Sequence, residues 1–167
     1  MKLHGLRGSE LEDMINRTID DYRVKKLALI QKIPTPITPL KQDEMGRIKD
    51  AYFQKKSTVD YIGLVQEIPV AFDAKESKTN KFPLSNIHEH QYIFMSEWEE
   101  QGGASFLLIL FREHFICYYM RFSELKKYWS QKKDFYMEDL DTKYFIDVKN
   151  KIKVDFLEKL QLDINER

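Results

Sequence analysis

Residues 58–75 read TVDYIGLVQEIPVAFDAK, and this stretch decides the fold. Two runs rich in apolar and β-branched side chains, 57–63 and 68–76, lie on either side of the polar pair Gln66-Glu67. Such runs separated by a short polar turn predict two adjacent strands. Side chains alternate between the faces of a strand, so Asp73 and Lys75 are predicted to share one face.

Asp60 belongs to the first run, and pairing of the two strands can bring it beside Asp73 and Lys75. Two carboxylates and a lysine form the basic layout of a metal-dependent phosphodiesterase. Carboxylate oxygens hold Mg²⁺ without removing all its waters, and the ion activates a water and neutralises charge developing on phosphate. Two structural alternatives stay open. Asp60 can accept hydrogen bonds from local backbone N–H groups, and Lys75 can form a purely structural ion pair with Asp73.

The segments outside this pair predict an α/β protein with a mixed central sheet flanked by helices and a protruding Pro-rich stalk. Ser9 and Glu12 form a capping box that starts a helix. Three prolines exclude a central strand or a helix from the stalk region. The predicted elements are a helix at 9–22, a strand at 24–32, the stalk at 34–50, a helix at 84–101, strands at 104–111 and 114–119, a helix at 123–131 capped by Ser123, a strand at 152–154 and a helix ending at Gln161.

Length and composition favour a single domain, 1–167, in the cytoplasm. The chain has 167 residues, enough for a proper core. It contains neither an apolar run of about 20 residues, as a membrane span needs, nor the apolar stretch of a signal peptide after Met1. The single cysteine, Cys117, excludes an internal disulfide and a cysteine-rich zinc site. The net charge of zero permits DNA binding but does not argue for it.

Several ordered motifs resemble the RecU family of Holliday-junction resolvases. The central one, STVDYIG at 57–63, is similar to the family signature Ser-Thr-x-Asp-Tyr-x-Gly. The other matching blocks are RGSELE at 7–12, KIPTPI at 32–37, AYF at 51–53, FDAKESK at 72–78 and FPLSNIHEHQ at 82–91. The resemblance covers roughly residues 5–120 and is loose over the last fifty or so.

The resemblance implies a restriction-endonuclease-like core that nicks four-way DNA junctions with Mg²⁺, for which Mn²⁺ is a plausible substitute. It implies that Thr58, Asp60, Asp73 and Gln91 hold the metal. It also implies that Lys75 stabilises the charge added in the transition state, so that Lys75, Asp73 and Asp60 are the catalytic residues.

Three points qualify this assignment. The family usually has Glu where this chain has Asp73, and Asp is one methylene shorter. The spacing from Lys75 to Gln91 is one residue shorter than the common family spacing. Glu12 is a candidate to reach the metal through water, although its capping role already accounts for it.

The resemblance also implies a homodimer that cuts a nearly two-fold symmetric junction twice, with the stalk entering the junction centre. Possible partners are a recombinase or a branch-migration helicase; no membrane is expected. Two alternatives remain: a related nuclease that acts on flap or duplex DNA, and a catalytically weakened accessory protein that binds junctions.

Two further motifs have competing interpretations. His88 and His90 suggest zinc, but on a helix they would point about 200° apart and could not share one ion. Tyr52, Phe53 and Tyr61 could stack on unpaired bases, although core packing is the more common use of aromatic side chains.

Overall fold

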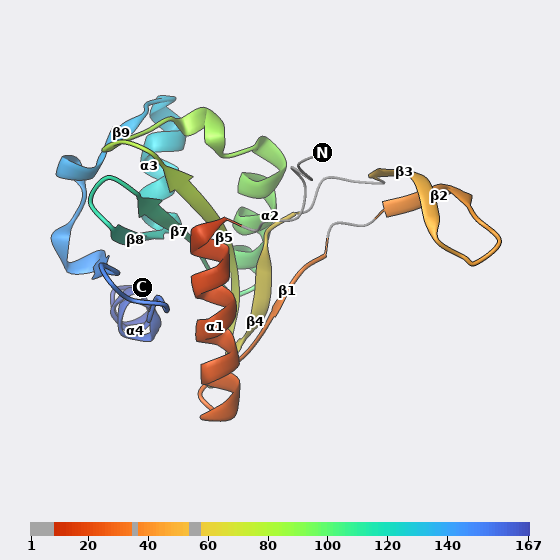
Figure 1. Cartoon of the computed structure of the whole chain (residues 1–167). Helices are drawn as coiled ribbons and strands as arrows, with labels where there is room; N and C mark the ends of the chain where they lie inside the picture. The colour runs from red at the N-terminus through yellow and green to blue at the C-terminus, as the bar shows by residue number, and fades with distance from the viewer. Residues whose placement is uncertain (1–8, 35–36, 54–57) are drawn as a thin grey trace.

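The computed structural model describes residues 9–34, 37–53 and 58–167, and its centre is a mixed six-stranded sheet (Figure 1). The strands follow the order β1 (Leu29–Lys32), β4 (Tyr61–Val65), β5 (Ile68–Ser77), β7 (Ala104–Phe111), β8 (Ile116–Arg121) and β10 (Phe145–Asp147). Only β5 and β7 are parallel neighbours within this sheet; the other adjacent pairs are antiparallel. The predicted mixed sheet is confirmed.

The predicted β4–β5 hairpin is confirmed. Val65 pairs with Ile68 at its closed end, and Gln66 and Glu67 have φ of 46° and 74°. Positive φ at both central residues matches the right-handed twist of the strands. Gly63 lets β1 pack closely, because a Cβ atom there would lie 2.2 Å from the carbonyl oxygen of Leu29.

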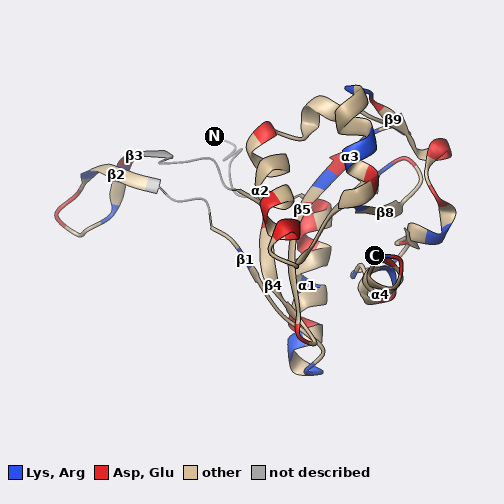
Figure 2. Ribbon diagram, turned by 180° about the vertical axis from the view of Figure 1, so that it is seen from behind, with Lys and Arg blue, Asp and Glu red and all other residues tan. Residues whose placement is uncertain are grey.

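Helices cover both faces of the sheet (Figures 1 and 2). One face carries α1 (Glu10–Val24) and α4 (Leu157–Asn165), and the other carries α2 (Glu89–Glu100) and α3 (Phe122–Gln131). Of the helices that the structure describes, none combines the length and apolar character that crossing a bilayer requires. The short elements are the 3₁₀ turns η1 (Leu84–Asn86), η2 (Met137–Asp139) and η3 (Thr142–Tyr144) and the strand pair β6 (Lys81–Phe82) and β9 (Phe135–Tyr136).

The core under α1 and α4 is a row of aromatic rings that crosses four strands. Tyr61 stacks on Phe72 at 4.9 Å, Phe72 on Phe106 at 4.7 Å, and Phe106 on Tyr119 at 4.3 Å between ring centroids. All four side chains are fully buried. Tyr61 is therefore a core residue and cannot stack on DNA bases, whereas the side chains of Tyr52 and Phe53 lie outside those described.

Helix α1 confirms Ser9 as the N-cap: the Ser9 hydroxyl accepts a hydrogen bond from the Glu12 N–H at 3.2 Å. The Glu12 carboxylate, which a complete capping box would direct back to Ser9, pairs with Lys32. The helix continues two residues past the predicted end, to Val24. A turn with Lys26 at φ 57° follows. The first strand therefore begins at Leu29, and the prediction of a strand from residue 24 was wrong at that end.

The predicted helix at 84–101 is divided. Turn η1 is followed by extended backbone at Ile87 and His88, and α2 begins only at Glu89. The helix ends near the predicted Gly102, which has φ +88°. Similarly, Phe115 lies in a turn with φ 52°, so β8 begins at Ile116 and not at residue 114.

The C-terminal predictions needed the most correction. Arg121 occupies the N-cap of α3, so Ser123 does not cap this helix. The last strand is β10, which pairs with β8, and no strand forms at 152–154. Helix α4 extends to Asn165 and does not end at Gln161.

The predicted excursion forms a hairpin, β2 (Ile37–Gln42) and β3 (Ile48–Phe53), that stands away from the sheet (Figure 1). Its tip is closed by Asp43, whose carboxylate accepts hydrogen bonds from the N–H groups of Met45 at 3.0 Å and Arg47 at 2.9 Å. Met45 is 81% exposed. The motif residues Arg7, Gly8, Thr35, Pro36 and Ser57 lie outside the described residues.

Candidate active site

The strand register brings the two predicted carboxylates together. Tyr61 pairs with Phe72. In the neighbouring residues Asp60 and Asp73, each carboxylate accepts a backbone hydrogen bond from the segment that carries the other. Asp73 Oδ1 accepts a hydrogen bond from the Asp60 N–H at 3.1 Å, and Asp60 Oδ2 accepts one from the Ala74 N–H at 3.0 Å. Asp73 is fully buried. Each carboxylate is therefore held by the backbone of the strand that carries the other.

Lys75 lies on the same face of β5 as Asp73, as the alternation of the strand predicts. Its Nζ atom is 2.7 Å from Asp73 Oδ2. This short ion pair is the compensation that Asp73 Oδ2 receives among the described residues. A fully buried carboxylate still costs free energy to ionise unless its charge is compensated.

The electrostatic surroundings of Asp73 disfavour its ionised form. Burial raises the pKa of Asp73 to about 7, the carboxylate of Asp60 adds to this rise, and the ammonium of Lys75 opposes it. Near neutral pH Asp73 is therefore partly protonated, and a divalent cation bound there would compete with the proton.

Gln91 reaches the same place from the first turn of α2. Its Nε2 donates to Asp73 Oδ1 at 3.0 Å, while its Oε1 accepts from Lys75 Nζ and from the His88 N–H, each at 3.1 Å. The sequence prediction thus placed Gln91 correctly beside Asp73. In this conformation, however, the amide nitrogen faces the carboxylate and the amide oxygen caps the helix, a role that the motif did not reveal.

Thr58 is half-buried beside the buried Val59. The hydrogen bonds and ion pairs found among the described residues do not include its hydroxyl. Its role as a metal ligand stays a prediction.

A hollow of about 370 Å³ opens next to Lys75 and separates α1 from η1. Its lining includes Ser9, Glu12, Lys75, Asn86 and His88. The Glu12 side chain forms an ion pair with Lys32. Lys75 therefore stands between the Asp60–Asp73 pair and an open hollow large enough for a phosphate group.

The side-chain oxygens at this site can be compared with the ligands that a divalent cation requires. No group of three or more His, Cys, Asp or Glu side chains suited to a metal occurs within the described ranges. Mg²⁺, however, is usually held by one or two carboxylates, with waters and substrate phosphates completing its coordination. Asp60 and Asp73, whose carboxylates lie side by side, fit such an ion.

The histidine pair differs from the sequence prediction. His88 precedes the helix, and its ring stacks on that of His90 at 5.5 Å between centroids, with 12° between the planes. The argument that helical spacing separates the two rings was therefore wrong.

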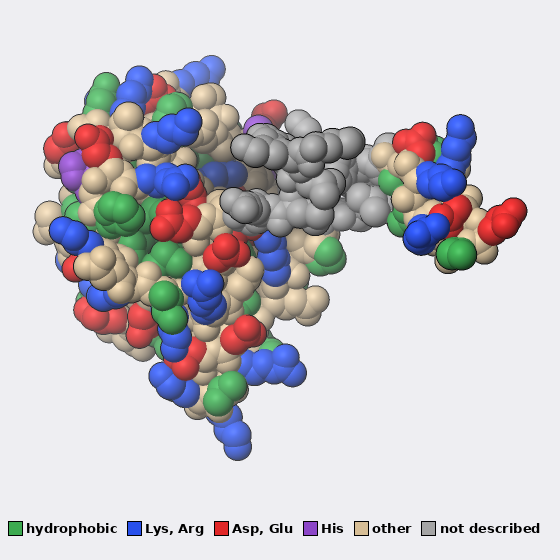
Figure 3. Space-filling view, in the orientation of Figure 1, with side chains coloured by type: hydrophobic (Ala, Val, Ile, Leu, Met, Phe, Trp, Pro, Cys, Tyr) green, Lys and Arg blue, Asp and Glu red, His purple; other side chains and the backbone are tan. Residues whose placement is uncertain are grey.

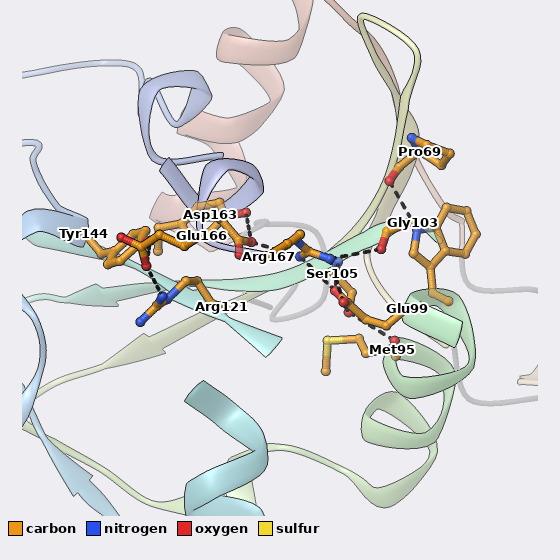
Figure 4. Close-up of polar contacts among 12 residues, drawn as sticks. Pro69, Met95, Glu99, Gly103, Ser105, Arg121, Tyr144, Asp163, Glu166 and Arg167 are labelled. Carbon is orange, nitrogen blue, oxygen red and sulfur yellow. Dashed lines mark hydrogen bonds and ion pairs between the residues drawn. The ribbon is translucent and has the colours of Figure 1, made fainter. Parts of the chain in front are cut away.

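A second cluster of polar side chains, built around the buried Ser105, Tyr119 and Asp163, lies at the opposite end of α2, and the sequence analysis missed it (Figure 4). Glu99 Oε1 accepts a hydrogen bond from the Ser105 N–H at 2.6 Å, and Arg167 Nη1 is 2.7 Å from Glu99 Oε2. Arg167 Nη2 also contacts Asp163 Oδ2 at 3.1 Å, which accepts from the Tyr119 hydroxyl at 3.0 Å. This cluster joins α2, β7, β8 and α4.

Comparison with known proteins identifies the family. The model of the family "RecU: Recombination protein U" matches residues 6–162. A protein of Limosilactobacillus reuteri named "Holliday junction resolvase RecU" is 42% identical over 137 residues, which cover 79% of this chain and 67% of that protein. A protein of the same name from Listeria welshimeri is 33% identical over 169 residues, covering 95% of this chain and 84% of that protein.

A search of solved structures found Hjc of Archaeoglobus fulgidus, a Holliday junction resolvase, at 8% identity and a TM-score of 0.42, over 70% of this chain and 78% of that one. A structural similarity this slight carries no argument about function. The family model, in contrast, spans nearly the whole chain, and both relatives exceed 30% identity. The chain therefore belongs to the RecU family.

Proposed function

We propose that this chain is a Mg²⁺-dependent endonuclease that resolves four-way DNA junctions by paired nicks. The observation that carries the proposal is the Asp60–Asp73 pair, in which Asp73 is fully buried, Asp60 is half-buried and the ammonium of Lys75 lies 2.7 Å from Asp73 Oδ2. The names of the RecU relatives supply the substrate class.

Asp60 and Asp73 would hold the ion, with Thr58 and Gln91 as the further ligands that the family motif suggests. When bound, the ion supplies activation of a water and neutralisation of phosphate charge. Asp73 stands where the family usually has Glu. The two side chains differ in length but not in ligand chemistry, because both present carboxylate oxygens. Mn²⁺ would replace Mg²⁺ on the same donors.

Lys75 contributes a fixed positive charge at the boundary of the hollow. Its side chain is 17% exposed, and Gln91 Oε1 and Asp73 restrict its position. A phosphate in the hollow would therefore meet an ammonium group that is already oriented, which lowers the cost of charge developing on its oxygens. Burial beside Asp73 keeps this ammonium from turning away into solvent.

The junction itself has near two-fold symmetry, and two symmetric nicks need two symmetric sites. A C₂ homodimer provides them. The β2–β3 hairpin would enter the junction centre, where shape and phosphate contacts, rather than base contacts, select the structure of the DNA.

Replacement of Asp73→Asn tests the site. The variant should lose Mg²⁺-dependent nicking of a four-way junction and still bind it, because the amide keeps the shape but not the charge that holds the ion. The matched control is Asp163→Asn, the buried carboxylate of the second cluster, which should keep its nicking activity per folded molecule. Flap and linear DNA are assayed in parallel to separate resolution from general cleavage.

Unchanged nicking by the Asp73→Asn variant would exclude the assigned site. Equal cleavage of four-way, flap and linear DNA by the unmodified chain would replace junction resolution with a general nuclease activity.

A further inference from the structure

The two sides of the hollow differ in charge. On one side, the first turn of α1 carries Glu10, Glu12 and Asp13. Arg112 and Lys32 pair with Glu10 and Glu12, respectively, so this side offers DNA no net positive charge. The backbone of DNA carries one negative charge about every 1.7 Å along the helix axis. A duplex that enters the hollow is therefore not attracted toward α1.

On the other side, the segment after α3 runs beside the segment that leads into η1. Phe135 pairs with Phe82. Asp134 accepts a hydrogen bond from the Leu84 N–H at 2.9 Å and forms an ion pair with Lys81 at 2.8 Å. Leu84 is two residues from Asn86, which lines the hollow. Two residues of chain span at most about 7 Å, so the post-α3 segment borders the hollow closely.

Three lysines on this side lack a carboxylate partner. Lys78, Lys132 and Lys133, the upper lysines, are exposed, and none of the ion pairs found in the described part of the chain includes them. Figure 3 shows Lys and Arg side chains along the upper edge of the body, the region where α3 and β9 lie in Figure 1. The upper lysines therefore present positive charge that no ion pair among the described residues neutralises.

The acidic side chains nearby limit the extent of this surface. Asp134 is occupied by Lys81, and Glu138 accepts a hydrogen bond from Asn80 Nδ2. Glu138 and Asp139 lie on the next turn, η2, and their negative charge repels a phosphate backbone on that side. A phosphate backbone can therefore contact the upper lysines only over a short length, next to the phosphate in the hollow.

We propose that the upper lysines bind the phosphate backbone of one duplex arm, which leaves the scissile phosphate over η1 toward the C-terminal end of α3. The inference rests on the proposed function and adds the direction in which the arm lies. Exposed lysines on phosphate position the duplex without reading its sequence. The contact therefore contributes to every junction sequence alike and weakens with salt.

The test measures binding of a four-way junction to the Asp73→Asn protein, without added Mg²⁺, as a function of salt. The combined change Lys132→Gln and Lys133→Gln removes two of the upper lysines. The matched control, Lys149→Gln with Lys151→Gln, removes two exposed lysines that lie away from the hollow, in the segment after β10. We expect the first pair, but not the control, to weaken binding at least about tenfold near 0.1 M salt and to reduce the salt slope by about 2.

A second variant, Lys132→Arg with Lys133→Arg, should keep the affinity, because it keeps both charges. Equal affinities for the glutamine pair and its control would overturn the proposed arm direction while leaving the nuclease assignment intact. Failure of the Asp73→Asn protein itself to bind any four-way junction would instead contradict the proposed function. Unchanged thermal unfolding of the glutamine variants shows that any loss arises from the DNA contact.

Discussion

The two ends of helix α2 each hold a cluster of polar side chains around a buried carboxylate, and the clusters differ in how well their charges are compensated. At the C-terminal end, Asp163 Oδ2 accepts from Tyr119 and pairs with Arg167, and Glu99 has two partners. At the N-terminal end, Asp73 pairs with Lys75, but burial and the neighbouring Asp60 carboxylate still raise the pKa of Asp73 to about 7.

The difference separates a structural role from a functional one. A polar cluster whose members are all paired fastens elements together and gains nothing from a ligand. A buried carboxylate beside a second one, with its pKa raised to about 7, costs stability when it ionises, and such sites are typical of ligand binding and catalysis. Residue types alone do not distinguish the two clusters, since both contain carboxylates, a cation and polar neighbours.

The largest expected effect is on catalysis by Lys75. Lys75→Gln should lower the nicking rate roughly 10²–10³-fold, the usual cost of removing one oriented group that stabilises transition-state charge. Mg²⁺ affinity should fall little, because both carboxylates remain. The rate is measured under single-turnover conditions at saturating Mg²⁺, with Lys149→Gln as the control. A rate within twofold of the unmodified protein would make Lys75 a structural partner of Asp73 only.

The second cluster should respond in the opposite way. Arg167→Ala leaves the Asp163 carboxylate, which is 3% exposed, with only Tyr119 as a partner. We expect unfolding free energy in urea to fall by about 2 kcal/mol, with unchanged nicking per folded molecule. The control, Arg112→Ala, removes a half-exposed cation from surface pairs and should cost less than about 1 kcal/mol. A loss of nicking without a loss of stability would link this cluster to catalysis.

The smallest effect is a pH dependence of metal binding. In the metal-free protein the pKa of Asp73 is raised to about 7, so a proton competes with Mg²⁺ below that pH. Affinity should be about tenfold weaker at pH 6 than at pH 8, as measured by isothermal titration. Asp163→Asn should retain this dependence. Equal affinities at the two pH values would show that Asp73 is ionised throughout.

Stability should follow the same group with the opposite sign. Because the folded-state pKa is above the unfolded value of 3.8, ionised Asp73 destabilises the metal-free protein fully above pH 7, and the penalty fades as pH falls toward 4. The unfolding free energy in urea, measured without metal at the same pH values, is therefore an internal check on the pH titration of metal binding.

The sequence analysis predicted the local elements whose signals are local. The hairpin at Gln66-Glu67, the Ser9 cap of α1, and the shared face of Asp73 and Lys75 were confirmed. Turn chemistry, capping and alternation depend on neighbouring residues alone. The motif also placed Gln91 near Asp73, although neither the break in the helix before Glu89 nor the capping role of the Gln91 oxygen follows from spacing.

The C-terminal part shows where such reasoning stops. Strand β10 forms because it pairs with β8 at the edge of the sheet. Arg167 joins the second cluster because α4 brings it next to Glu99, 68 residues away in the chain. Neither contact leaves a periodic pattern in the sequence.

By itself, the sequence determined the family, the mixed α/β character and the identity of the carboxylate–lysine set, because these depend on residue type and short spacing. Packing in three dimensions decided which carboxylate is buried beside a second one, which polar cluster joins α2 to α4, and which segments border the hollow. The physical reason is that compensation of charge depends on groups that are distant in the chain and become neighbours only when the sheet and its helices have packed.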